Sequence, residues 1–143
     1  MTMNDQTIEQ EIRAKGKTAP RVTPADIEAN IASTHFFTAA EGVSGATLDA
    51  GGAEVIGGKL VVSMPSALAL LTFCVLVLRN GFTVTGESAC ASPENFDAEI
   101  GRKIARQNAV QKIWPLMGYQ LRAALHQRAL FQGHLKADGC DQG

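Results

Sequence analysis

The sequence lacks an apolar run long enough to cross a membrane. Its longest one, Ala67–Leu78, has twelve residues with a single hydroxyl group and no charge, whereas a transmembrane helix needs about 20 apolar residues. Arg79 follows this run and a polar, glycine-rich segment precedes Pro65, so the run cannot be extended. The polar, acidic start of the chain also lacks the apolar segment of a secretory signal. We therefore expect no membrane association.

Cysteine is scarce and scattered. Cys74, Cys90 and Cys140 are the three in the chain, and none of them has metal-ligand spacing to a histidine. Reduced thiols are therefore favoured over a disulfide or a zinc site. The sequence predicts no metal site and no cofactor.

Motifs that carry catalysis are also missing. The chain has no nucleophile elbow, no paired-histidine zinc motif and no dinucleotide fingerprint. Gly57-Gly58-Lys59 is not a phosphate-binding loop, because neither the glycine spacing nor a following Ser or Thr fits. These absences favour a binding protein over an enzyme, and we predict no catalytic residue.

Acidic residues are absent from residues 100–137, although the net charge of the chain is only −1. Such a stretch can bind an anionic partner such as nucleic acid or a nucleotide. The alternative, which we favour, is a solvated helix face that the acidic half of the chain partly balances. The seven basic residues are Arg102, Lys103, Arg106, Lys112, Arg122, Arg128 and Lys136.

The length of 143 residues is that of one domain. Residues 1–21 are polar and predict a flexible N-terminal tail, with at most a helical turn around Ile8–Arg13. Residues 22–132 predict a single helical domain that contains a glycine-rich insert at 41–64. Residues 133–143 predict a second flexible tail.

The expected fold class is mainly α, a compact helical domain with a small β-hairpin or sheet element. At its centre we predict a buried helix over 66–79, because Ala67–Leu78 is apolar on every side and longer than a typical strand. The cap at Thr23 and Pro24 starts a helix over 24–38. A long helix over 93–113 follows, and Pro115 breaks or kinks it before a continuation over 115–131.

Two short β segments are expected beside these helices. Glu54–Ile56 and Lys59–Val62 flank the two-residue loop Gly57-Gly58, which is typical of a β-hairpin. Phe82–Thr85 alternates apolar and hydroxyl residues, as a short strand does. In the long helix, Gly101, Ala105 and Ala109 form a row of small residues that another helix could approach. Together with the apolar surface of the last two predicted helices, this row predicts a homo-oligomer.

The candidate ligand site is the segment 83–92 together with the helix that follows it. Hydroxyl groups, free amides at a helix start and guanidinium groups are the components of an anion or nucleotide pocket. Glu94 and Asp97 oppose this interpretation, because their carboxylates would repel an anion. The candidate ligand-binding residues are Thr83, Thr85, Glu87, Ser88, Ser92, Asn95, Arg102 and Arg106.

Three stretches carry a resemblance to a known family. GESACASPENFD and IGRKIARQNA, within residues 70–122, and RVTPADIEANI from Arg21 resemble the Gp-forty-nine-like family of small proteins from N-four-like and Sf-six-like phages and prophages. The resemblance covers residues 21–125 without the glycine-rich segment 44–63. It implies no activity or catalytic residue. It implies a setting: an accessory protein in the cytoplasm of an infected bacterium.

Two functional hypotheses follow. The first is a counter-defence or host-takeover protein that sequesters a nucleotide-like small molecule or blocks a host protein. The second is a nucleic-acid-binding phage regulator that uses the basic residues of 100–137. No aromatic residue alternates with the cations from Arg102 to Lys112, and no helix-turn-helix is evident, so the sequence favours the first.

Overall fold

The computed structural model describes residues 4–17 and 19–139. The chain divides into two compact units, a terminal unit of residues 1–29 and 113–143 and a central unit of residues 30–112. Helix makes up 55% of the chain and strand 22%. The protein is therefore mixed α and β, and the predicted mainly α class is right only in part. The predicted domain boundaries at 21/22 and 132/133 stay predictions.

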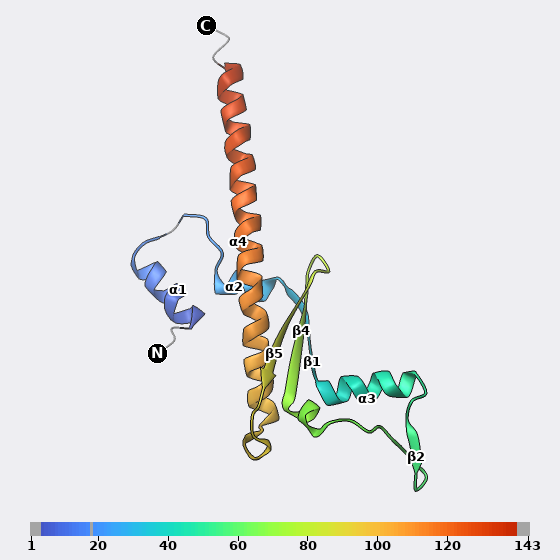
Figure 1. Cartoon of the computed structure of the whole chain (residues 1–143). Coiled ribbons are helices and arrows are strands. Elements are labelled where there is room, and N and C mark those ends of the chain that lie inside the picture. The colour runs from blue at the N-terminus through green and yellow to red at the C-terminus, as the bar shows by residue number, and fades with distance from the viewer. Residues whose placement is uncertain (1–3, 18, 140–143) are drawn as a thin grey trace. The chain divides into compact units, whose positions relative to one another are not determined.

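The central unit is built on an antiparallel sheet. Strands β1 (Ile31–Thr38), β4 (Leu71–Leu78) and β5 (Thr83–Ala89) lie side by side in the order β1-β4-β5 (Figure 1). A tight turn at Gly81, whose φ of 88° favours glycine, joins β4 to β5. The central strand β4 therefore has a neighbour on both edges.

The apolar run at the centre of the chain is this strand, so the predicted buried helix over 66–79 is wrong. The run is divided between a 3-10 helix η1 (Ser66–Leu70) and β4. In β4, residues alternate between fully buried and half-buried, so both faces of the strand are covered to some extent. A central strand with two covered faces is apolar throughout, which periodicity cannot distinguish from a buried helix.

The predicted helix over 24–38 is also wrong beyond its first turns. Helix α2 (Pro24–Ala29) begins as expected, since Thr23 Oγ1 accepts from the Asp26 amide at 3.1 Å. The chain then enters β1, whose sequence IASTHFFT is rich in β-branched and aromatic residues. Strand propensity and pairing with β4 end the helix after Ala29.

A helix that the sequence analysis missed follows β1. Helix α3 (Ala39–Asp49) begins with a capping box, in which Thr38 Oγ1 accepts from the Glu41 amide while Glu41 accepts from Thr38. The signature T-A-A-E lies at Thr38–Glu41, between the predicted helix over 24–38 and the predicted glycine-rich insert at 41–64, and most of α3 falls within that insert.

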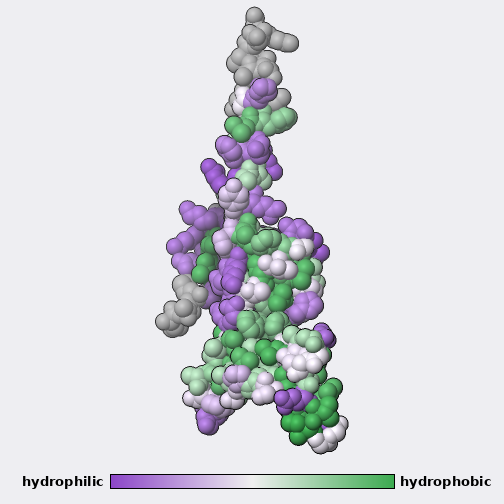
Figure 2. All heavy atoms as spheres, turned by 45° about the vertical axis from the view of Figure 1, so that its right-hand side comes forward, coloured by the Kyte–Doolittle hydropathy of each residue, from purple (hydrophilic) through white to green (hydrophobic). Residues whose placement is uncertain are grey.

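The predicted hairpin is confirmed. Strands β2 (Glu54–Ile56) and β3 (Lys59–Val61) pair antiparallel, with Gly57 at φ 58° and Gly58 at 78° in the loop. All six strand residues are exposed. The hairpin therefore shows as a hydrophobic patch at the lower end of the surface in Figure 2.

One long helix, α4 (Ala98–Gly139), follows the short 3-10 helix η2 (Pro93–Asn95). The predicted break at Pro115 is wrong, because helix continues on both sides of this residue. The helix also includes residues 133–139 of the predicted C-terminal tail, whose last four residues lie outside the described residues. Among the described helices, none is both long and apolar enough to span a bilayer.

The row of small residues on α4 packs against the sheet. An added Cβ at Gly86 of β5 would lie 2.1 Å from the Ala105 carbonyl oxygen and 2.3 Å from the Ala109 nitrogen, and one at Gly101 would lie 3.1 Å from Thr72 Oγ1. The close approach that we predicted is present, but strand β5 of the same chain makes it. The row thus gives no support to a homo-oligomer, which stays a prediction. The core of the central unit is made of Cys74, Leu76, Leu78, Val84, Ala105, Ala109 and Val110.

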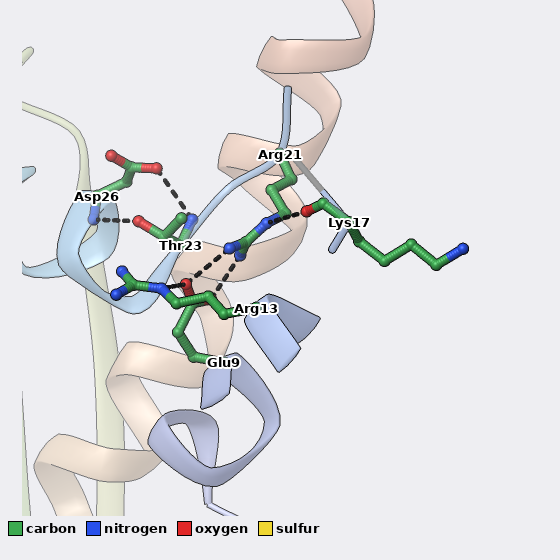
Figure 3. A network of polar contacts seen from close by, with 6 residues as sticks. All are labelled: Glu9, Arg13, Lys17, Arg21, Thr23 and Asp26. Atoms are coloured by element: carbon green, nitrogen blue, oxygen red, sulfur yellow. Dashed lines mark hydrogen bonds and ion pairs between the residues drawn. The ribbon is translucent and has the colours of Figure 1, made fainter. Parts of the chain in front are cut away.

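The terminal unit contains a helix where the sequence predicted only a transient turn. Helix α1 (Asp5–Ala14) places Glu9 in a buried position, where both carboxylate oxygens accept from the Arg21 guanidinium and one also accepts from Arg13 Nε (Figure 3). The Trp114 indole donates to Asp5 Oδ2 at 3.1 Å. These bonds connect α1 to the segment before α2 and to α4.

Candidate functional site

A pocket in the central unit has a volume of about 360 Å³ and is larger than a second pocket of about 130 Å³ in the same unit. The end of β1, the start of α3 and the start of α4 form its walls. The residues of its lining include Phe36, Phe37, Thr38, Glu41, Phe96 and Arg102. Phe36 and Phe96 beside one arginine give a mostly apolar cavity with a single cation, a composition typical of small-molecule sites.

The phenylalanines reach the pocket because of their places in the strand and in the loop. The Phe37 ring stacks on Phe73 of β4 with ring centroids 5.4 Å apart, on the face of the sheet away from α4, because Phe73 pairs with Glu87. Phe36 precedes it and pairs in register with Cys74. Phe96 lies between η2 and α4. Phe36 remains 38% exposed, so its ring is accessible to a ligand.

The two charged groups of the pocket differ in their availability. The Glu41 carboxylate accepts from the Thr38 amide at 3.2 Å and from its hydroxyl at 3.1 Å, so it is engaged in capping α3. Arg102 is exposed, and no hydrogen bond or ion pair joins it to another residue in the described part of the chain. The Arg102 guanidinium is therefore the charged group that can bind a ligand.

Three of the candidate residues lie on another surface. Thr83, Thr85 and Glu87 alternate with buried Val84 and Gly86 along β5, and all three are exposed. Since Gly86 faces α4, alternation places the three on the opposite face of the sheet. They do not line either pocket.

Two other candidates line the second pocket, of about 130 Å³. Ser88 and Asn95 lie there with Cys90 and Asp97. Ser92 lies beside this pocket, and its carbonyl oxygen accepts from Cys90 Sγ at 3.1 Å. The two pockets share Phe96 and Thr72 in their lining.

Arg106 lies near the core. Burial raises the pKa of the Cys74 thiol, and the Arg106 guanidinium lowers it in part. Of the eight candidates, the structure therefore brings only Arg102 to the larger pocket.

The sequence analysis did not select the phenylalanines. Phe36 and Phe37 are adjacent and Phe96 is some 60 residues away, so their meeting depends on the order of strands in the sheet. No local spacing carries that information. Within residues 4–17 and 19–134, no three His, Cys, Asp or Glu side chains gather closely enough to hold a metal ion.

Comparison with known proteins decides the family. The family described as "Phage protein (N4 Gp49/phage Sf6 gene 66) family" matches residues 22–125, a range that includes both pockets. The chain belongs to this family. The resemblance of the GESACASPENFD and IGRKIARQNA stretches is thereby confirmed, and both lie within the matched range. No curated protein and no solved structure matches the chain.

Proposed function

We propose that this phage protein is a non-enzymatic accessory protein that binds a nucleotide-like small molecule in the phenylalanine-lined pocket. It would act in the cytoplasm of the infected bacterium, sequestering its ligand to the advantage of the phage in counter-defence or host takeover. The observation that carries the proposal is the pocket itself, with Phe36 and Phe96 beside Arg102.

The chemistry of these side chains fits a planar ring that bears a negative charge. Stacking of a base on an aromatic side chain contributes about 1–3 kcal/mol. A hydrogen bond between the Arg102 guanidinium and a phosphate oxygen contributes about 1.5–3 kcal/mol. The volume of about 360 Å³ lies at the lower end of the usual range for ligand pockets, so it suits a molecule of mononucleotide size.

The alternative is a regulator that binds nucleic acid through α4. Its support is that all seven basic residues between 100 and 137 lie on this one helix, in a stretch that contains no acidic residue. A nucleic-acid complex would weaken steeply with added salt, because bound phosphates release counterions. Binding in a pocket with one cation would depend far less on salt.

The first experiment is native mass spectrometry of the protein purified from infected cells, which detects a retained small molecule directly. Isothermal titration calorimetry with nucleosides and nucleotides would then measure affinity for wild type and Arg102→Ala. We expect the variant to bind a nucleotide about ten- to hundredfold more weakly, since one charged hydrogen bond is lost.

Lys103→Ala is the matched control. Lys103 is the next residue of α4, is exposed, and pairs with Glu99 at 3.2 Å outside the pocket. The Lys103→Ala substitution removes one positive charge, as Arg102→Ala does, but changes no residue of the pocket. We therefore expect this variant to bind the nucleotide with wild-type affinity. Equal losses in both variants, or salt-sensitive binding to DNA without nucleotide binding, would reject the pocket in favour of the regulator. If no nucleotide binds at all, the proposal is wrong.

A further inference from the structure

The β2–β3 hairpin exposes an unusual amount of apolar surface for its size. Val55 is 71% exposed, Leu60 66% and Ile56 59%. In the described part of the chain, no third strand pairs with either edge of this two-stranded sheet. A lone hairpin is marginally stable in water, whereas three or more strands with a covered face are stable.

The register of the hairpin determines which backbone groups are free. Ile56 and Lys59 flank the two-residue loop and pair with each other, so they exchange hydrogen bonds across the hairpin. The next pair, Val55 and Leu60, is then the non-hydrogen-bonded pair, whose N–H and C=O groups point away from the partner strand. Val55 thus presents both a donor and an acceptor on the outer edge of β2.

A donor and an acceptor on one residue are self-complementary about a twofold axis. We propose that the β2 edges of two copies of this chain pair antiparallel around Val55, which joins the two hairpins into a four-stranded sheet. Each Val55 N–H donates to the Val55 carbonyl oxygen of the other copy. This interface is separate from the ligand pocket and does not depend on the proposed function.

Side chains on both faces agree with this register. On one face of the four-stranded sheet, the side chains lie in the order Leu60 and Val55 of one copy, then Val55 and Leu60 of the other. These four side chains form an unbroken apolar row. On the other face, Glu54 lies opposite Ile56 of the second copy, so the two Glu54 carboxylates are not opposite each other. Each row of that face contains one Lys59 and one Glu54, from different copies, so the charges are complementary.

The β2 edge is favoured over the β3 edge for two reasons. Two of the three β2 residues, Val55 and Ile56, are β-branched, whereas β3 has only Val61. A lysine on an edge strand also discourages pairing, and Lys59 lies in β3.

Proline substitution tests the proposal. Val55→Pro removes the outward N–H of β2 without removing any hydrogen bond inside the hairpin. Leu60→Pro makes the same change on the β3 edge and is the matched control. By sedimentation velocity of the full chain over a wide concentration range, we expect wild type and Leu60→Pro to dimerise and Val55→Pro to do so at least about tenfold more weakly.

Amide exchange gives a second measurement on the wild-type chain. The Val55 amide should become protected from exchange as protein concentration rises, because only the second copy supplies its acceptor. A wild-type chain that stays monomeric, or a Val55→Pro variant that dimerises as well as Leu60→Pro, would overturn the proposal. So would a Val55 amide whose exchange rate is independent of concentration.

Discussion

Gly86 is the residue at which β5 and α4 come closest. The Cβ atom of an alanine here would lie 2.1 Å from the Ala105 carbonyl oxygen, well inside van der Waals contact. Because the obstructing atoms are backbone, only a shift of the helix can relieve the overlap. We expect Gly86→Ala to lower the free energy of unfolding by about 3 kcal/mol or more, measured by urea denaturation with circular dichroism.

Gly118→Ala is the control for this substitution. Gly118 lies within α4, and a Cβ there would meet no atom within 4 Å. Since alanine is the better helix former, this variant should keep or gain up to about 1 kcal/mol of stability. If Gly86→Ala were as stable as Gly118→Ala, the close packing of α4 on β5 would be wrong.

Residue-level patterns predicted the close approach but not the approaching element. The spacing of Gly101, Ala105 and Ala109 marks one helix face as small, and the structure confirms that a neighbour comes near it. A sequence pattern on one helix does not say whether that neighbour is a helix or a strand. Gly86, the other half of the contact, is 19 positions from Ala105, so only the tertiary fold relates them.

At the scale of secondary-structure elements, local signals were more reliable than length. The Gly57-Gly58 loop and the Thr23 cap both specify geometry within a few residues, and the structure confirms both. The length of Ala67–Leu78 led to the wrong prediction of a helix, because two consecutive elements, η1 and β4, share this one apolar run. The burial of β4 depends on α4 and on two neighbouring strands, which the run itself does not reveal.

Pro115 is the unfavourable residue of α4. Proline has no amide hydrogen and its ring crowds the carbonyl of the residue four positions earlier, which costs a helix about 3 kcal/mol. We expect Pro115→Ala to raise the free energy of unfolding by about 1–3 kcal/mol, because the helix regains a hydrogen bond. Urea denaturation of both chains measures the difference.

Gln120→Ala serves as the control for Pro115→Ala. Gln120 is exposed on α4, and glutamine and alanine are both good helix formers, so its stability should stay close to wild type. A loss of stability in Pro115→Ala would show instead that the protein uses the proline to position the neighbouring Trp114, whose indole bonds to Asp5.

For the whole molecule, the candidate site shows what topology adds to sequence. The sequence predicted Arg102 as a ligand-binding residue, and the structure places it in the lining of the larger pocket. It grouped Thr83, Thr85 and Glu87 with Arg102 because all lie in one stretch of chain, but strand alternation turns the three away from α4. Which residues share a cavity thus depends on strand order and on the packed face, both of which are long-range properties.

The terminal unit depends on a charge that acid removes. Hydrogen bonds from Arg21, with a smaller contribution from Arg13, lower the pKa of Glu9 from 4.5 to about 2, although burial opposes the shift. A carboxyl whose pKa is lower in the folded state stabilises that state fully above pH 4.5 and loses this contribution as the pH falls toward 2. Glu9→Gln removes this contribution at every pH.

We therefore expect the thermal midpoints of wild type and Glu9→Gln to differ at neutral pH and to converge as the pH falls from 4.5 toward 2. Trp114 is the only tryptophan and lies in the terminal unit, so its fluorescence reports on that unit. The pH-dependent difference should appear in the Trp114 fluorescence. Arg13 and Arg21, whose side chains donate hydrogen bonds to the Glu9 carboxylate, belong to the same unit as Trp114. A difference between the two midpoints that stays constant with pH would mean that the Glu9 carboxylate contributes nothing through its ionisation, and that the variant is destabilised by altered packing instead.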